Sequence, residues 1–439
     1  MANFKTYSAA LIGCGRIGYS LGLDKKREQP ASHTMALLAN SKINLLTACD
    51  TNPQNLQKWH DAYKKLAVYN DSASLYIRQK PEIITIAVNE NAHLKETLAA
   101  INQNPRLIIL EKPVALNMNE AQLINSAAFL NKVPILVNHE RRFSEDFNLA
   151  KKYMSQIGEV QSINASLYSS LAVYDSNQEQ TGAYSLIHDG THLVDAVLFF
   201  LEDENNFSQT KEISVIDSSK FADFNSDSNA DFKSENFNSK ISSSGDFTSN
   251  LNADFSKISA ELSKFQNPQN QNPQNQNPQN QKRGLLNKVL SFKTLPKKTK
   301  FINNILNSPK ITGIFRDEKN CVRQFTANYS TKKCPSVSIS MSGRSKFFGF
   351  EITITGTQGR ICIGNGYLKL YKREESSLYT GFYSLANDKS QKFPKKTLYF
   401  SNMIQNAVDF LDGKCELKST LQTGINALAV LEEIKDLIK

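Results

Sequence analysis

The feature that most constrains this chain is a glycine cluster, Gly13-Cys14-Gly15-Arg16-Ile17-Gly18, which lies between two short apolar runs at residues 7–13 and 43–49. Both runs have the composition of buried parallel strands, and residues 33–40 between them have helical spacing. In such a unit the first glycine permits a tight turn, the second lets the backbone approach a pyrophosphate, and the third lets the helix pack on the strand. The cluster therefore predicts a dinucleotide site that includes Gly13, Gly15, Arg16, Ile17 and Gly18.

An acidic residue, Asp50, follows the second apolar run. At the end of that strand its carboxylate can accept hydrogen bonds from the adenosine ribose hydroxyls, and it would repel a 2′-phosphate. We therefore expect NAD as the cofactor, with NADP as the alternative. Asp50 follows Gly18 by 32 residues, against about 20 in the usual fingerprint, and we attribute the excess to a loop at residues 24–30.

Strand and helix patterns continue to alternate as far as residue 137. Strands are expected near Val68 and at residues 83–88, 107–110 and 134–137, with helices at 53–66, before Lys80, at 94–101 and at 120–130. Such alternation is typical of an α/β protein with a doubly wound parallel sheet. We assign residues 1–140 to an N-terminal NAD(P)-binding Rossmann domain.

The pattern changes after about Arg142. Helices are expected at residues 145–157 and 184–201, and strands at 160–168 and 212–217. Strand patterns return near residue 311 and at 337–341, 347–355, 360–364 and 368–371, before helices at 402–411 and 421–437. Residues 141–217 and 310–439 are therefore predicted to form a C-terminal α+β substrate and dimerisation domain with a largely antiparallel open sheet.

Residues 218–309 have the composition of a low-complexity insertion, with a repeat of Gln-Asn-Pro-Gln-Asn at 266–280. This composition predicts disorder, because it offers too little apolar surface to offset chain entropy. The segment 282–300 carries seven basic residues and no acid, within a formal net charge of +10. The basicity is thus local, and we expect no nucleic-acid partner. The basic end is either a solvated helix or a contact for an anionic membrane surface or an acidic partner.

The first residues lack the basic and apolar segments of an export signal, and no apolar run reaches the roughly 20 residues that span a bilayer. We therefore expect a cytoplasmic protein without a transmembrane segment. The six cysteines show no CxxC spacing. Disulfides and a bound metal are accordingly not expected.

Three further motifs accompany the glycine cluster. They are Asn89-Glu90-Asn91-Ala92-His93 and Glu111-Lys112-Pro113, each after a predicted strand, and His188-Asp189-Gly190-Thr191-His192. Together with Glu140-Arg141-Arg142-Phe143, they resemble motifs of the Gfo/Idh/MocA family, which includes glucose-fructose oxidoreductase and inositol dehydrogenase. The resemblance implies that Lys112 lies where nicotinamide meets substrate and that Pro113 is a candidate cis-proline. It also implies cofactor contacts from Asn89, His93, Glu111 and Lys112.

The resemblance further implies a catalytic role for His192. Oxidising a carbinol requires a base for the hydroxyl proton while hydride leaves for nicotinamide, and imidazole can accept that proton near neutral pH. We assign His192 as the general acid/base and Lys112 as its partner. Many family members have an aspartate four residues before this histidine, whereas this chain has His188, with Asp189 shifted by one. His188 is therefore the second candidate catalytic residue.

Several of these assignments have structural alternatives. Asp189 and Arg142 are candidate substrate ligands, but Arg142 would serve equally well in a salt bridge at the domain boundary. His93 either contacts the ribose or caps a helix, and His33 either reaches the cofactor or simply follows a capping Ser32.

The expected activity is NAD(P)-dependent hydride transfer at a ring carbinol of a sugar, cyclitol or nucleotide-sugar, in a homodimer or homotetramer. One alternative is an epimerase or hydrolase that retains NAD and oxidises its substrate transiently. Another is a non-catalytic dinucleotide-binding regulator or scaffold.

Overall fold

The N-terminal third of the protein is built on a six-stranded parallel sheet. The structure is a computed structural model that describes residues 5–175, 185–202, 306, 308–331 and 334–439. The sheet has the order β3-β2-β1-β4-β5-β6, with every neighbouring pair parallel. Its strands are β1 (Tyr7–Ile12), β2 (Ile43–Cys49), β3 (Ala67–Tyr69), β4 (Ile83–Ile86), β5 (Leu107–Leu110) and β6 (Ile135–Val137).

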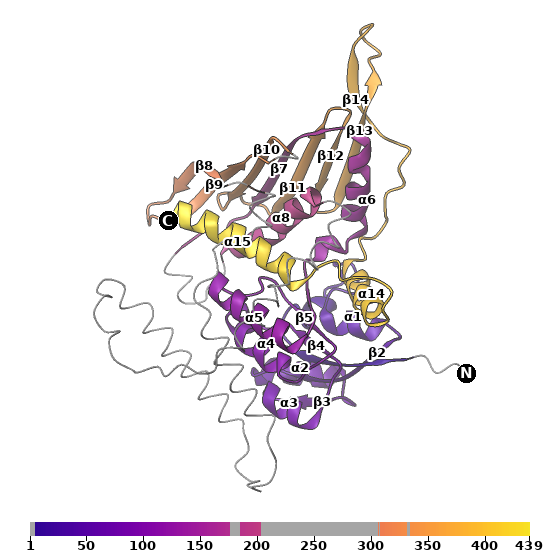
Figure 1. The fold of residues 1–439 in the computed structure, drawn as a ribbon, viewed down its shortest axis with the longest axis vertical. Coiled ribbons are helices and arrows are strands. Elements are labelled where there is room, and N and C mark those ends of the chain that lie inside the picture. Colours follow the sequence, from indigo (N-terminus) through magenta and orange to yellow (C-terminus); the bar gives the residue numbers. More distant parts are fainter. Residues whose placement is uncertain (1–4, 176–184, 203–305, 307, 332–333) are drawn as a thin grey trace, which may run out of the picture. The chain divides into compact units, whose positions relative to one another are not determined.

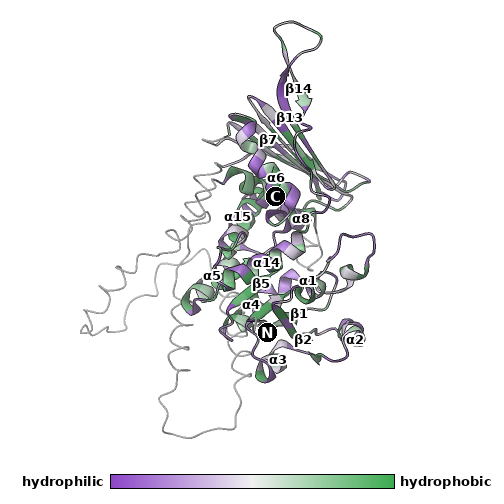
Figure 2. Ribbon diagram, turned by 90° about the vertical axis from the view of Figure 1, so that its right-hand side faces the viewer, coloured by the Kyte–Doolittle hydropathy of each residue, from purple (hydrophilic) through white to green (hydrophobic). Residues whose placement is uncertain are grey.

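The central strands are buried on both sides, as expected for a parallel sheet covered by helices. Every residue of β4, β5 and β6 is buried, and the hydrophobic colouring of β1 and β5 in Figure 2 shows the same layer. The covering helices are α1 (His33–Ala39), α2 (Pro53–Ala62), α3 (Ser72–Arg78), α4 (His93–Ile101) and α5 (Met118–Asn131). Four of them begin at a side-chain cap, provided by Ser32, Asn52, Asp71 and Asn117.

The helix that should follow the glycine cluster is divided in two. A first turn forms when Tyr19 N donates to Gly15 O at 2.9 Å, and a short 3-10 helix, η1 (Ser20–Leu23), follows. The chain then leaves and returns at α1, where His33 N donates to Ile17 O at 3.0 Å. Residues 19–32 thus form an insertion, called the excursion below, that interrupts the helix after the glycine cluster. The helix continues at α1, whose first N–H groups bond to carbonyls of the cluster. The excursion accounts for the long spacing between Gly18 and Asp50.

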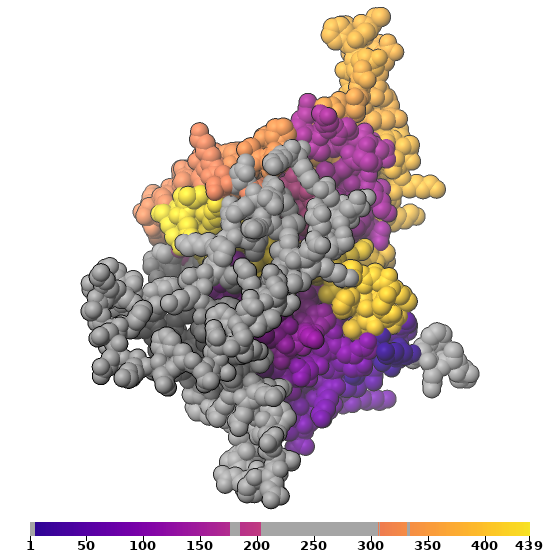
Figure 3. All heavy atoms as spheres, in the orientation of Figure 1, coloured from indigo at the N-terminus to yellow at the C-terminus, as the bar shows by residue number. Residues whose placement is uncertain are grey.

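The second sheet has eight strands in the order β14-β13-β12-β11-β7-β10-β9-β8. Only the β10–β7 pair is parallel, and β13 and β14 extend past the other strands in Figure 3. The predicted largely antiparallel sheet is therefore confirmed. The strands are β7 (Val160–Tyr168), β8 (Lys310–Arg316), β9 (Val322–Tyr329), β10 (Ser336–Ser342), β11 (Gly349–Gly356), β12 (Gly359–Gly364), β13 (Tyr367–Glu375) and β14 (Tyr383–Asn387).

One face of this sheet packs on helices. Residues Ile163, Ala165 and Leu167 of β7 are buried, whereas Asn164, between the first two, is exposed. The apolar face is covered by α8 (Leu186–Leu201) and α15 (Leu421–Ile438), which lie side by side in Figure 1, and by α6 (Glu145–Tyr153). This alternation is typical of a sheet with one buried face.

The chain returns to the first sheet near its C-terminus. Helix α14 (Tyr399–Leu411) lies against α1, and its Phe400 and Met403 belong to the core that also contains Leu11. Glu28 of the excursion accepts hydrogen bonds from Thr397 N at 2.8 Å and Leu398 N at 2.6 Å, just before this helix. Part of the segment 310–439 therefore completes the core of the N-terminal sheet.

The predicted fold, a doubly wound parallel sheet followed by an α+β part with a largely antiparallel sheet, is confirmed. The prediction missed two strands, β9 and β14. The expected strand at 212–217 lies outside the described residues, as does the predicted insertion at 218–309 apart from Leu306 and residues 308–309. Among the helices of the described ranges, none is long and apolar enough to cross a membrane.

Candidate active site

The glycine cluster turns at the carboxyl end of β1, next to the point where the strand order reverses between β1 and β4. Gly13 has a φ of +101°, and a Cβ placed there would lie 2.5 Å from Ala87 O. A Cβ on Gly18 would lie 2.0 Å from Gly13 O. Both positions therefore require glycine for the turn itself.

Gly15 differs, because a Cβ there would meet no protein atom within 4 Å. Within the described ranges, no acceptor is bonded to the N–H groups of Gly15, Arg16 or Ile17. Open space beside unbonded amides at the first turn of a helix suits a pyrophosphate. The cluster therefore fits the phosphates of NAD.

Asp50 supports this turn from the end of β2. Its Oδ2 accepts a hydrogen bond from Cys14 N at 2.7 Å, and its Oδ1 accepts one from Asn52 N at 2.7 Å. The carboxylate is partly exposed beside the cluster. This position agrees with the expected contact to a ribose, and it also gives Asp50 a structural role in the turn.

Glu111, after β5, lies in a buried network rather than toward a bound molecule. Its Oε1 accepts from His33 Nε2 at 2.6 Å and from Asn138 Nδ2 at 2.6 Å. Burial raises the pKa of Glu111, but the hydrogen bond and charge of His33, the Asn138 bond and the charge of Lys112 outweigh burial and lower it. Glu111 is thus an ionised group that holds the start of the Lys112 segment in place.

His93 is also buried and bonded to backbone. Its Nδ1 donates to Pro113 O at 2.6 Å, and its Nε2 lies 3.2 Å from Val88 O. Burial lowers its pKa. Asn89 occupies the position before the 3-10 helix η2 (Glu90–Ala92), and its side chain makes no capping bond. The geometry thus favours a structural role for His93, linking the segments after β4 and β5.

The Lys112–Pro113 peptide bond is cis, as the family resemblance implied. Lys112 Nζ lies 3.7 Å from Asp189 Oδ1, and both side chains are mostly buried. Asp189 belongs to the first turn of α8. The structure therefore brings together a residue that follows β5 and a residue of α8.

His188 and His192 lie one turn apart on α8. His188 Nδ1 is hydrogen-bonded to Glu90 Oε1, which follows β4. His192 Nδ1 is buried and has no hydrogen-bond partner among the described residues. Burial lowers the pKa of His192 well below 6.5, and the charges of Lys112, Arg141 and His139 lower it further. The two imidazoles therefore have opposite environments, one beside a carboxylate and one among cations.

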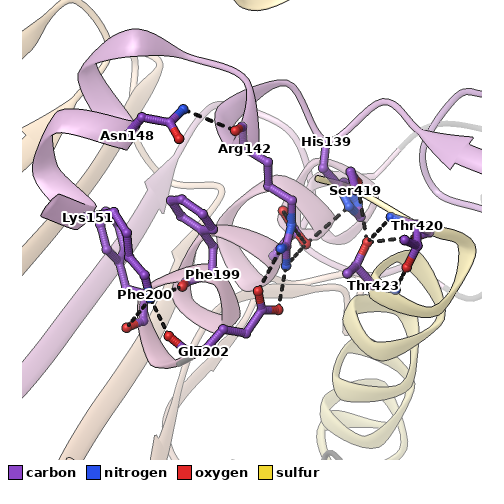
Figure 4. A network of polar contacts seen from close by, with 11 residues as sticks. His139, Arg142, Asn148, Lys151, Phe199, Phe200, Glu202, Ser419, Thr420 and Thr423 are labelled. Atoms are coloured by element: carbon purple, nitrogen blue, oxygen red, sulfur yellow. Dashed lines mark hydrogen bonds and ion pairs between the residues drawn. The ribbon is translucent and has the colours of Figure 1, made fainter. Parts of the chain in front are cut away.

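Arg142 is fully engaged inside the protein (Figure 4). Its Nε donates to Asp195 Oδ1 and Oδ2 at 2.9 Å, and its two terminal nitrogens donate to Glu202 at 2.8 and 2.9 Å. Its side chain is 1% exposed. The geometry thus favours the salt-bridge alternative over a substrate contact.

Four residues of the site were not singled out as site residues in the sequence. Glu90 bonds His188, and Asn138 bonds Glu111. His139 Nε2 lies 3.2 Å from Thr191 Oγ1, and the Arg141 guanidinium lies 3.9 Å from the centre of the Phe350 ring. Their common signal was polar residues directly after a buried strand, at 89–90 and 138–141, which in a parallel sheet all reach the same edge.

The order of the parallel strands and the glycine turn after β1 together define a Rossmann fold of the dinucleotide-binding type. Residues 7–139 match the family described as "Oxidoreductase family, NAD-binding Rossmann fold", GFO_IDH_MocA. Over these residues, the match confirms the resemblance to the Gfo/Idh/MocA family.

Individual relatives are distant. The chain is 23% identical over 199 residues to D-glucoside 3-dehydrogenase of Escherichia coli (strain K12), covering 44% of this chain and 53% of the relative. It is 25% identical over 190 residues to inositol 2-dehydrogenase of Salmonella typhimurium, covering 42% and 52%. The chain spans about half the length of these curated relatives.

The fold likeness extends further than the sequence likeness. The WlbA dehydrogenase of Bordetella pertussis, solved with NADH and UDP-GlcNAcA, has a TM-score of 0.57 and 12% identity, with 99% of this chain and 95% of that chain covered. The likeness therefore includes the second sheet as well as the Rossmann sheet.

Proposed function

We propose that this protein is an NAD-dependent oxidoreductase that moves a hydride between nicotinamide and a ring carbinol of a sugar, cyclitol or nucleotide-sugar. The observation that carries the proposal is that Lys112 lies close to Asp189 and His192, in the first turns of α8. This contact is at the same edge of the parallel sheet as the glycine cluster. NAD, when bound, accepts or returns the hydride. NADP is the alternative cofactor, which Asp50 disfavours.

In this proposal His192 is the base. Its depressed pKa keeps the imidazole neutral near pH 7, so that it can accept a hydroxyl proton as hydride leaves the same carbon. Lys112, held beside Asp189 at 3.7 Å, donates a hydrogen bond to the reacting oxygen and stabilises the negative charge that develops there. Asp189 orients the lysine and contacts neighbouring substrate hydroxyls.

The substrate class is supported by the relatives, whose names refer to a glucoside and to inositol, and by the nucleotide-sugar in the WlbA structure. We further propose a cytoplasmic homodimer or homotetramer. The eight-stranded sheet supports this assembly, since exposed residues such as Asn164 and Glu351 leave one of its faces uncovered within the described chain. Sedimentation velocity measures the assembly state.

The test is turnover measured at 340 nm with NAD and a panel of sugars, cyclitols and nucleotide-sugars. His192→Ala should lower kcat by about 10²-fold or more, while the Kd for NAD changes little. His60→Ala, on α2, is the control and should retain full activity. Unchanged turnover of a confirmed substrate by His192→Ala would refute the assignment of His192.

The same assay separates the alternatives. A retained cofactor that is oxidised and reduced within one cycle gives product without net change at 340 nm, which would indicate an epimerase or hydrolase. Cofactor binding without turnover of any compound in the panel would indicate a regulator or scaffold. The presence of both Lys112 and His192 at one place in the structure favours an enzyme.

A further inference from the structure

The contact between Glu90 and His188 joins two parts of the site. Glu90 follows β4 and starts η2, whereas His188 lies in the first turn of α8. The Glu90 and His188 side chains are only 16% and 13% exposed, and Oε1 of Glu90 is bonded to Nδ1 of His188. The neighbouring residue of the helix, Asp189, contacts Lys112. The pair is therefore part of the same constellation as Lys112.

Glu90 is an acceptor in this bond. Burial raises the pKa of Glu90, but the hydrogen bond and charge of His188, followed by the charges of Lys112 and His93, lower it below its usual value. An ionised carboxylate can only accept. The proton of the bond therefore stays on Nδ1 of His188, and protonation of this ring changes at Nε2.

His192 is placed differently. The charges that lower its pKa are those of Lys112, Arg141 and His139. Two imidazoles spaced by four residues face the same side of a helix, yet one is paired with an anion and the other is surrounded by cations. The carboxylate favours protonation of His188, and the cations disfavour protonation of His192. Such a difference in proton affinity is typical of sites where one titratable group acts as the acid and another as the base.

We propose that Glu90 is a positioning residue that fixes the tautomer of His188 and makes Nε2 of His188 a second proton-exchanging atom beside Lys112 and His192. This inference rests on the proposed function. When protonated at Nε2, His188 then donates a hydrogen bond to a substrate hydroxyl, while neutral His192 accepts the proton of the reacting hydroxyl as hydride leaves the same carbon. The chain thus replaces a single acid by a carboxylate–imidazole pair contributed by two segments.

Within the part of the chain that the structure describes, the charged and titratable groups around the pair come from four segments. They are His93 at the start of α4, Lys112 after β5, Asp189 and His192 on α8, and more distantly Arg141 and His139 after β6. Glu90 is an anion in hydrogen-bond contact with the ring, so its removal should lower the proton affinity of His188.

The experiment is an NMR titration of the full-length protein labelled with ¹⁵N-histidine, with the His188 signals assigned by loss in His188→Asn. In Glu90→Gln, the midpoint of His188 titration should fall by about one unit or more, and both neutral tautomers should be populated. Glu90→Asp should restore much of the wild-type midpoint. Glu82→Gln is the matched control, since Glu82 precedes β4 at the opposite end of the strand.

Kinetics supply a second measurement. Glu90→Gln should lower kcat at least tenfold and shift the pH profile of kcat, while the Kd for NAD stays within twofold. A His188 midpoint within 0.3 units of wild type in Glu90→Gln would overturn the inference, as would unchanged kcat in both Glu90→Gln and His188→Asn. If the wild-type protein turned over no substrate, the proposed function would fail, and with it the role of His188 in catalysis. The titration alone would still decide whether Glu90 sets the ionisation of His188.

Discussion

Replacing Arg142 by methionine should strongly destabilise the protein, because it leaves two carboxylates inside it. Asp195 is 1% exposed and Glu202 10% exposed, and Arg142 makes four hydrogen bonds of 2.8 to 2.9 Å to them. Methionine keeps much of the apolar stem but removes the charge. Breaking a buried ion pair in this way costs about 3–5 kcal/mol, which corresponds to a loss of roughly 1–2 M in the urea midpoint.

The assay is urea unfolding at pH 7, followed by circular dichroism and by fluorescence of the single Trp59, which is fully buried. Coincidence of the two curves tests whether one midpoint describes the transition. Arg323→Met is the control, since Arg323 Nε also lies 2.9 Å from an aspartate oxygen but the pair is about one-third exposed. Its effect should be far smaller because solvent screens the pair.

A second replacement identifies the cause. Asp195→Asn in the Arg142→Met background removes the buried carboxylate that has lost its arginine partner and should recover part of the lost stability. The effects of the two replacements on the free energy of unfolding are therefore not additive. An Arg142→Met midpoint equal to that of Arg323→Met, combined with an increased KM, would refute this reasoning. That result would return Arg142 to the substrate-binding role.

The pH dependence follows from the same carboxylate. Burial raises the pKa of Asp195 and the charges of Arg142 and His139 lower it more, so the net pKa lies below the usual value. The stability from this pair is therefore fully present above the unfolded pKa of about 3.9 and is lost as pH falls through the lower folded value. Arg142→Met removes the larger of the two charges that lower the pKa of Asp195, so the stability difference from wild type should be largest near pH 7 and narrow toward pH 4.

Three further outcomes are expected. Gly15→Ala should fold normally and weaken NAD binding at least about tenfold, measured by titration calorimetry. Gly18→Ala should instead lower thermal stability, because its Cβ would lie 2.0 Å from Gly13 O, and scanning calorimetry measures this loss. Asp50→Ala should reduce NAD affinity and narrow the preference over NADP, measured by titration with each cofactor. Deleting residues 218–300 should leave hydride transfer intact, and loss of activity in a folded deletion variant would contradict the domain assignment.

The sequence predicts the first sheet well because buried parallel strands are continuous apolar runs between turn residues. Residues 43–49 and 107–110 were predicted at the bounds that the structure shows. Strand β14 escaped prediction because four of its five residues are exposed, which leaves no pattern of burial in the sequence. Helix α14 was predicted as a helix, but its packing on α1 depends on contacts between residues more than 350 positions apart, such as Asn40 with Gln405.

Within the site, the sequence locates residue types at strand ends but not the directions of their side chains. Lys112, Asp189 and His192 were expected together, and the structure brings them together. His93 and Glu111 occupy equivalent strand ends, yet each is bonded inward to backbone or buried side chains. The difference depends on partners such as His33 and Asn138, which lie far from Glu111 in the sequence. A local sequence pattern does not show that they are close to Glu111 in space.

One buried carboxylate connects the two halves of the proposed site. Glu111 receives hydrogen bonds from His33, at the start of α1, and from Asn138, after β6. His33 N in turn bonds Ile17 O of the glycine cluster. Because Lys112 directly follows Glu111, the position of the lysine is fixed through the same network that fixes the phosphate-binding turn. The excursion at residues 19–32 does not disturb this arrangement, because α1 begins with a hydrogen bond from His33 N to Ile17 O of the cluster. This bond places the His33 side chain next to Glu111.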